Sequence, residues 1–177
     1  MKRRAFVTGV LASGVVIEAL AAQGHNHEET DGPLANATVS FGAWPSEPPF
    51  DRLVPPPAGS PPPPNVHKLI PYTATIKAGG NVNFVIAGFH NIAVYGPGST
   101  LESINASITT PVPGAPMGFP PLVNDTVNRV YRGSNPFTLP QDRTEVVNFS
   151  EPGTYLVICA FLPHFIDRMH GWVKVVK

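Results

Sequence analysis

Proline and glycine interrupt this chain too often to leave room for long helices. Its 177 residues include 22 prolines and 16 glycines, and no segment has the apolar spacing of an amphipathic helix of useful length. From residue 72 onward, apolar and polar residues alternate in short runs that Pro and Gly separate, which is the pattern of β-strands. The sequence therefore predicts an all-β sandwich or barrel.

We expect strands in several of these runs. They are TVSFGAW (38–44), YTATIK and NVNFVIAG within 72–88, HNIAVYG (90–96), RTEVVNFS (143–150), EPGTYLVICAF (151–161) and GWVKVVK (171–177). The pair within 72–88 is joined through Gly79-Gly80, which favours a hairpin. In RTEVVNFS, the alternation predicts that Val146 and Val147 face opposite sides.

Two segments lack this alternation. Half of residues 45–64 are proline, which indicates an extended surface connection, because proline has no N–H for a sheet. Residues 97–141 are rich in Pro, Gly, Ser and Asn, and a stretch this long without periodicity indicates a functional or covering insertion.

The N-terminus has the composition of a secretory signal. A basic run at residues 2–4 precedes an apolar run and the small residues ALAA (19–22). RRAF (3–6) also resembles a twin-arginine export signal, so two export routes stay open. Glu18 interrupts an apolar run already short for a bilayer, so we expect no stable membrane span after signal removal.

These features divide the chain into three parts and predict a periplasmic or secreted protein. The parts are a signal peptide (1–22), an arm with the first strand and proline-rich loop (23–66), and a main domain with the insertion (67–177). Twelve basic residues balance twelve acidic ones, so nothing suggests a nucleic-acid partner. The single cysteine, Cys159, cannot form an internal disulfide and must pair with another chain, stay free or bind something.

Cys159 has a histidine and a methionine close behind it. His164 follows by five residues and Met169 by five more. Thiolate, imidazole and thioether together select copper over hard ions, and the blue-copper arrangement needs two His, one Cys and a long axial Met. For the missing histidine we select His90, which lies between two expected strands. His170 adjoins Met169, and neighbours on an extended backbone point to opposite sides. The remaining histidines, His25, His27 and His67, lie in the arm or after the proline run.

These segments resemble the cupredoxins, the small blue copper proteins. The match lies in "HN" at His90-Asn91 and in FSEPGTYLVICAFLPHFIDRMHGWVKVV (149–176). It covers roughly residues 68–96 and 143–177, and the insertion and arm have no counterpart. The resemblance implies a Greek-key β-sandwich with one type 1 copper ion near its apolar end.

The resemblance also implies roles for individual residues. The equatorial ligands would be His90, Cys159 and His164, and Met169 would be the axial ligand. Asn91 would hydrogen-bond across to the ligand loop and hold it. The family often has glycine before the axial methionine, where this chain has Arg168, whose charge would lie near the copper edge.

The function that follows is single-electron transfer by an exported carrier, not an enzyme. Docking to redox partner proteins would be transient, through an apolar patch beside an exposed edge of His164. The residues expected in that patch are Phe89, Phe161, Pro163 and Phe165. Two alternatives remain: a periplasmic copper-handling protein, with His25, His27 and His170 as extra chelators, and a nitrosocyanin-like copper enzyme, against which Met169 argues. Met117, in the insertion, is expected to pack within its loop.

Overall fold

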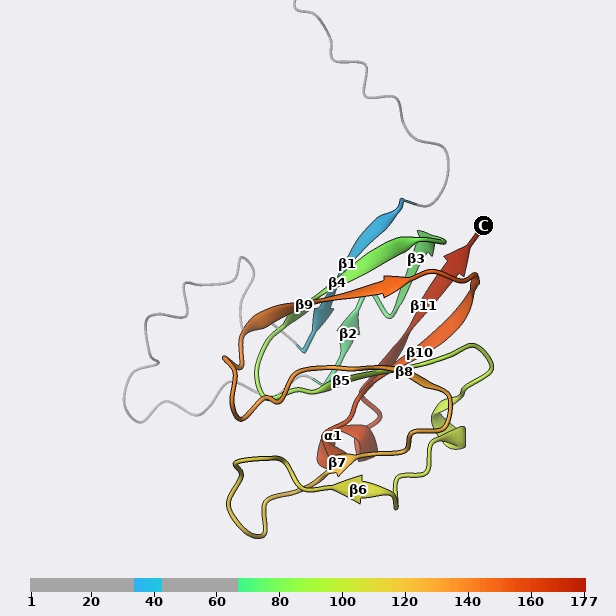
Figure 1. The fold of residues 1–177 in the computed structure, drawn as a ribbon. Coiled ribbons are helices and arrows are strands. Elements are labelled where there is room, and N and C mark those ends of the chain that lie inside the picture. The colour runs from blue at the N-terminus through green and yellow to red at the C-terminus, as the bar shows by residue number, and fades with distance from the viewer. Residues whose placement is uncertain (1–33, 43–66) are drawn as a thin grey trace, which may run out of the picture.

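Two mixed β-sheets pack face to face in the computed structural model, which describes residues 34–42 and 67–177 (Figure 1). The first sheet has the order β2-β1-β4-β9 and the second has the order β3-β11-β10-β5-β8. The bounds of the strands of the first sheet are Asn36–Phe41 (β1), Leu69–Ile70 (β2), Gly80–Ile86 (β4) and Arg143–Phe149 (β9). Those of the second are Thr73–Lys77 (β3), Ile92–Tyr95 (β5), Arg129–Arg132 (β8), Gly153–Cys159 (β10) and His170–Val176 (β11). The all-β sandwich prediction is confirmed.

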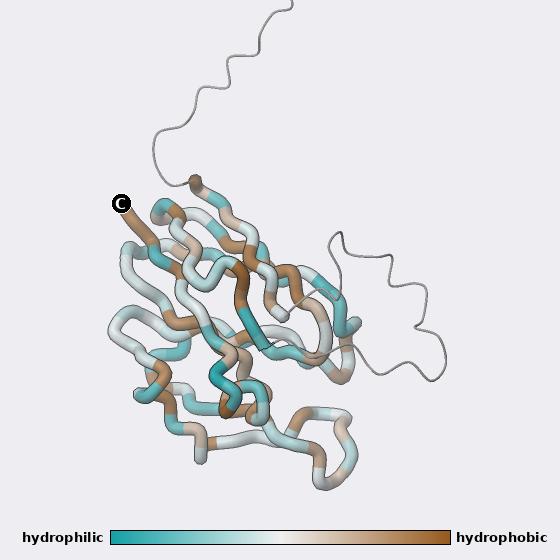
Figure 2. The backbone as a smooth tube through the Cα atoms, turned by 180° about the vertical axis from the view of Figure 1, so that it is seen from behind, coloured by the Kyte–Doolittle hydropathy of each residue, from teal (hydrophilic) through white to brown (hydrophobic). Residues whose placement is uncertain are grey.

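The alternation of the sequence becomes the alternation of buried and exposed side chains. In β4 and β9, every second residue faces the inter-sheet core, so Val147 is 4% exposed whereas its neighbour Val146 is 51% exposed. Figure 2 shows the hydrophobic segments interleaved with polar ones along the chain. Phe41 and Phe84 meet edge to face in this core, with ring centroids 6.1 Å apart.

The expected hairpin through Gly79-Gly80 is wrong. β3 and β4 follow one another in the chain but belong to different sheets. β3 pairs in parallel with β11, and β4 pairs in parallel with β1 and antiparallel with β9. The turn at Gly79, with a φ of 82°, therefore carries the chain across the sandwich. Two parallel pairings with distant strands outweigh the local hairpin signal.

The 97–141 segment covers the outer face of the second sheet. It contains a 3-10 turn at Leu101–Ser103 (η1), the two-stranded sheet of Thr109–Thr110 (β6) with Leu122–Val123 (β7), and the edge strand β8. Because of this cover, β5 and most of β10 are buried on both faces. Alternate residues of these strands enter two separate clusters. The cluster between the two sheets contains Ile92, Val94, Val157 and Cys159. The cluster between the second sheet and the 97–141 segment, which we call the outer cluster, contains Ala93, Tyr95, Leu156 and Ile158.

One end of the sandwich gathers the irregular elements. The short helix Leu162–Ile166 (α1) lies between β10 and β11, and Figure 1 shows it beside β7 and β6, at the end opposite the C-terminus. Within the described ranges, no helix is long and apolar enough to cross a membrane. The expected signal peptide, the proline-rich loop, His25 and His27 all lie outside the described residues.

Candidate metal centre

Three side chains from distant parts of the chain converge at the α1 end of the sandwich. Cys159 is the last residue of β10, His164 lies in α1, and His90 lies just before β5. The Nδ1 atoms of His90 and His164 are 3.0 Å apart, and each is 3.6 Å from the Sγ atom of Cys159. They form the one group of three or more His, Cys, Asp or Glu side chains in 34–42 and 67–177 that is close enough to hold a metal ion.

The size and chemistry of this triangle fit a small, soft metal ion. An ion that lies in the plane of two imidazole nitrogens and a thiolate, at about 2.0–2.3 Å from each, separates the donors by about 3.5–3.8 Å. The measured edges lie within about 0.5 Å of those values. Nitrogen combined with thiolate sulfur is the donor set that copper prefers over hard cations.

Burial holds all three groups in their neutral forms when no ion is bound. Desolvation, with the charges of His164 and His67 adding to it, lowers the pKa of His90 to about 3. Desolvation, and then His67, lowers the pKa of His164 to about 4. Burial also raises the pKa of the fully buried Cys159 thiol to about 12, although backbone N–H groups of Asn91 and Phe161 partly oppose it. Neutral imidazoles are ready to accept a metal, whereas the thiol must lose its proton first.

The orientation of His90 depends on a glycine. The carbonyl of Ala87 accepts a hydrogen bond from the His90 ring, which leaves Nδ1 free to face Cys159 and His164. Gly42, which directly follows β1, has a φ of 90° and packs against the ring. A Cβ atom there would lie 2.6 Å from His90 Nε2 and 2.6 Å from the Ala87 carbonyl oxygen. A side chain at this position would therefore displace the ring.

The main chain of Met169 is hydrogen-bonded to the main chains of His164 and Cys159. Its N–H donates to the His164 carbonyl at 2.9 Å, its carbonyl accepts from the Cys159 N–H at 3.0 Å, and its side chain is buried. The preceding Arg168 has a φ of 60°, in the left-handed region that favours glycine. His170 turns away, because its Nε2 meets the Tyr72 hydroxyl.

The surroundings of Arg168 differ from expectation. Its side chain is 66% exposed and pairs with Glu102 of η1 at 3.2 Å, so its charge points into solvent and not toward the three donors. It ties the loop between α1 and β11 to the insertion.

Solved structures with a similar fold are known. Auracyanin from the photosynthetic bacterium Roseiflexus castenholzii superposes with a TM-score of 0.51 at 18% identity, over 82% of this chain and 100% of that one. The chain has a cupredoxin fold. Auracyanin B (TM-score 0.47, 18% identity, 83% of this chain and 93% of that one) and a pseudoazurin from Sinorhizobium (TM-score 0.40, 19% identity, 80% and 74%) are more distant. No family model and no curated protein matches the sequence.

On this cupredoxin fold, His67 also reaches the site, although it was not among the ligands expected from the sequence. Its ring stacks on that of His164, with centroids 3.9 Å apart and planes tilted by 31°, and lies 6.2 Å from the ring of His90. Its Nδ1 meets the carboxylate of Asp167, at the end of α1. His67 thus covers one face of the His164 ring. His164 was expected to have an exposed edge, but it is only 7% exposed. The proline run before His67 gave no sign of this contact.

Asn91 does not reach the ligand loop through its side chain as expected. Its Nδ2 donates to the carbonyls of Gly133 and Ser134, at 3.0 and 2.8 Å, both in the insertion. It is the Asn91 main-chain carbonyl that bonds across to the loop, accepting from the Ala160 N–H at 2.6 Å. Asn91 therefore links the site to the insertion as well as to the loop after Cys159.

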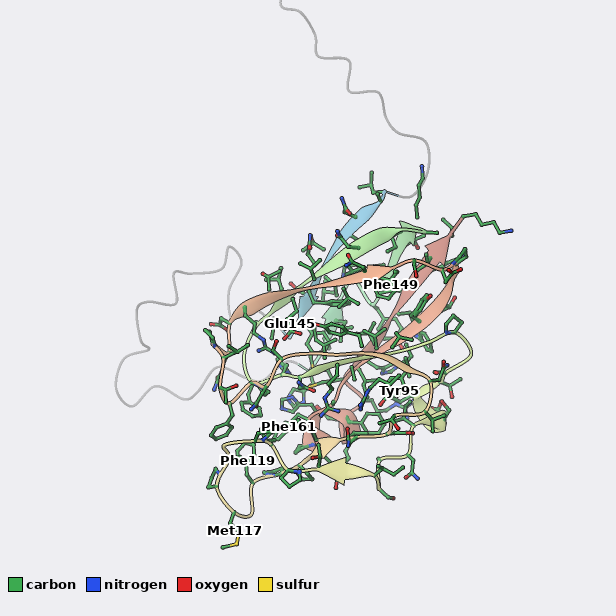
Figure 3. The ribbon with its side chains drawn as sticks, viewed as in Figure 1. Tyr95, Met117, Phe119, Glu145, Phe149 and Phe161 are labelled. Carbon is green, nitrogen blue, oxygen red and sulfur yellow. The ribbon has the colours of Figure 1, made fainter. Side chains whose placement is uncertain are left out.

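Four phenylalanine rings cover the site, and two of them come from the insertion. Phe89, Phe119 and Phe161 are mutually in contact at centroid distances of 5.0–5.6 Å, and Phe137 adds contacts of 5.8 and 5.3 Å to the first two. Figure 3 shows Phe161 and Phe119 near one another, on the side of β7 and α1. We call these four rings the phenylalanine cluster.

The cluster forms the wall of a cleft of about 640 Å³ that reaches both histidines of the site. Its lining has no Asp, Glu, Lys or Arg; it consists of Phe89, His90, Phe119, Pro120, Pro136, Phe137, Leu139, Gln141, Phe161, Pro163 and His164. Met117 does not pack in its loop as expected. It is fully exposed and projects from the tip between β6 and β7 (Figure 3).

The prediction for Phe165 is wrong. It is 9% exposed and packs with Tyr95 and Leu101 in the outer cluster, away from the cleft. Within the short helix α1, Pro163 and His164 line the cleft, whereas the next residue, Phe165, points to the outer cluster. Of the other expected patch residues, Phe89, Phe161 and Pro163 line it.

Proposed function

We propose that this protein carries single electrons by means of one type 1 copper ion. The observation that carries the proposal is the triangle of His90 Nδ1, His164 Nδ1 and Cys159 Sγ, with edges of 3.0–3.6 Å. Cys159, His90 and His164 are the proposed equatorial ligands, and Met169, buried between the other two loop residues, is the proposed axial ligand. Copper, when bound, supplies reversible one-electron chemistry at this position.

The residues of the site favour fast electron exchange because they are already in place. His90 is fixed by Ala87 and Gly42, and Cys159 and His164 are fixed through hydrogen bonds to the main chain of Met169. Ligands held this way need little rearrangement when the charge at the site changes. Burial of all three excludes water, which leaves the thiolate of Cys159 to the metal.

Electrons would enter and leave through the cleft. His164 and His90 both line it, and the rest of its lining is apolar or neutral. A neutral apolar surface suits brief docking of a redox partner protein, because it needs no desolvation of charges. Phe89, Phe161 and Pro163 belong to this proposed docking surface, which the insertion extends through Phe119 and Phe137.

We further propose that the protein is exported to the periplasm or secreted, after removal of residues 1–22. The charged start and the small residues ALAA (19–22) support this. The domain proposed for 67–177 also takes in β1, which pairs with β2 and β4.

Neither alternative function gains support from the described residues. Of the extra chelators expected for copper handling, His25 and His27 lie outside the described residues, and the His170 ring is engaged with Tyr72 and with the Arg168 carbonyl. A nitrosocyanin-like enzyme would have a carboxylate among the ligands, whereas the group of converging donors holds none in the part of the chain that is described.

A reductive titration tests electron transfer separately from copper binding. The copper-loaded protein should take up one electron per copper ion, lose its visible absorption in proportion, and regain it on reoxidation over repeated cycles. Loss of copper on reduction, or absorption that does not return, would contradict a carrier role.

A further inference from the structure

A buried ion pair lies directly behind His90. The Arg143 guanidinium and the Glu145 carboxylate, both on β9, are 2.7 Å apart, and their side chains are only 9% and 6% exposed. They occupy the inward-facing positions of β9 that Val147 and Phe149 continue. Replacing such a pair by apolar residues is often neutral or stabilising, so stability alone gives little reason for charges at these positions.

The pair connects the candidate metal centre to the insertion. Arg143 Nη2 donates to the carbonyl of His90 at 2.9 Å and to that of Ser134 at 3.4 Å. Glu145 accepts from the Ser134 N–H at 3.2 Å and from the Tyr131 hydroxyl at 2.9 Å. Burial, and then the hydrogen bond to Glu145, raises the pKa of Tyr131 to about 12, so this phenol stays a neutral donor.

The positive charge of Arg143 lies close to the centre. Its Nη2 is 2.9 Å from the carbonyl oxygen of His90, which carries one of the three donors, and the Arg143 side chain is only 9% exposed. A positive charge at this place favours the state of the centre that carries less positive charge. At short range in a buried region, such an interaction is weakly screened.

We propose that Arg143 is a positioning residue of the metal centre, and that Glu145 sets how much of its charge the centre experiences. This inference rests on the proposed copper function. The guanidinium holds the His90 main chain against the insertion, and its charge favours the reduced centre, because reduction lowers the positive charge of the centre by one. The carboxylate of Glu145 offsets that preference.

The test removes each charge in turn and measures the reduction potential. Glu145→Gln keeps the shape but leaves Arg143 uncompensated, so the equilibrium should shift about tenfold toward the reduced form, which is about 59 mV for one electron. Arg143→Gln should shift it in the opposite direction by a similar factor. A merely structural pair would shift both variants in the same direction or neither.

Two further variants sharpen this test. Glu102→Gln removes a carboxylate that also pairs with an arginine but is 71% exposed, and it should shift the equilibrium less than twofold. Arg143→Lys keeps the charge, but one compact ammonium cannot reproduce the spread of the guanidinium, whose Nε, Nη1 and Nη2 donate in different directions. Its equilibrium between the oxidised and reduced forms should therefore stay within about threefold of that of the wild type. Its visible absorption band should nevertheless change, because the main chain of His90 is held differently.

The outcomes separate this inference from the proposed function. A wild-type protein without a thiolate-to-copper band overturns both. A normal band with a Glu145→Gln potential equal to that of Glu102→Gln overturns the inference alone. If Arg143→Gln does not fold, the comparison of those two glutamate variants still decides the role of charge, and an unchanged band in Arg143→Lys overturns the positioning role.

Discussion

Gly42→Ala tests whether the close approach of β1 fixes the His90 ring. Two effects add at this position. A left-handed backbone disfavours an alanine by about 1–2 kcal/mol, and the new Cβ atom would lie 2.6 Å from both His90 Nε2 and the Ala87 carbonyl oxygen. Overpacking of this kind costs about 1–3 kcal/mol more. The free energy of unfolding should therefore fall by about 2–5 kcal/mol.

Gly98→Ala is the matched control for this prediction. Its φ of 87° is almost the same as the 90° of Gly42, but nothing lies within 4 Å of a Cβ atom there. It should lose only the backbone part, about 1–2 kcal/mol, and keep normal copper binding.

Urea unfolding of the metal-free proteins measures the two losses, and a copper titration measures the effect on the site. Gly42→Ala should lose more stability than Gly98→Ala and should also bind copper more weakly, because the His90 ring has moved. Equal losses and equal copper affinities in the two variants would refute the proposed support of His90 by Gly42.

Two other predictions concern acid stability and docking. Burial, and then the charges of His164 and His67, lowers the pKa of His90 to about 3 in the folded metal-free protein, against 6.5 when unfolded. The unfolded chain then binds more protons in acid, so this stability is fully present above about pH 6.5 and is lost toward pH 3. The free energy of unfolding, measured with denaturant between pH 7 and pH 4, should fall by about 3 kcal/mol because of this residue. In His90→Gln the free energy of unfolding should depend less steeply on pH. An equally steep pH dependence in the variant would contradict the assignment to His90. Phe137→Glu places a charge on the rim of the cleft, where Phe137 is 41% exposed. It should slow electron exchange with a haem protein used as a redox probe at least several-fold without changing the visible spectrum, whereas Val146→Glu, on the outer face of β9, should not. Equal rates in both variants would count against the cleft as the docking surface.

Local patterns in the sequence predicted much of the fold. The strands of the second half follow from alternation, because side chains of an exposed sheet face alternate with those of the core. β5 and β10 break that rule, since the insertion buries their second face. The hairpin between β3 and β4 was predicted wrongly, because the partners of both strands are distant in sequence.

The site was predictable to the extent that its chemistry is rare. A single cysteine followed by a histidine and a methionine is conspicuous, and it led to the three donors that converge in the structure. His67 and Arg143 could not be found this way, since their contacts with His164 and His90 span more than fifty residues. The sequence held one signal for the ion pair. Arg143 and Glu145 alternate in step with Val147 and Phe149, so they take positions of β9 where apolar residues facing the core are expected.

The visible absorption spectrum of the protein with Cu(II), compared with that of Cys159→Ser, tests the type 1 site most directly. We expect an intense thiolate-to-copper band at one copper ion per chain, which the variant lacks while it remains folded. A weak spectrum that is the same in both proteins would mean that copper binds only through imidazoles, and it would contradict a type 1 centre at Cys159.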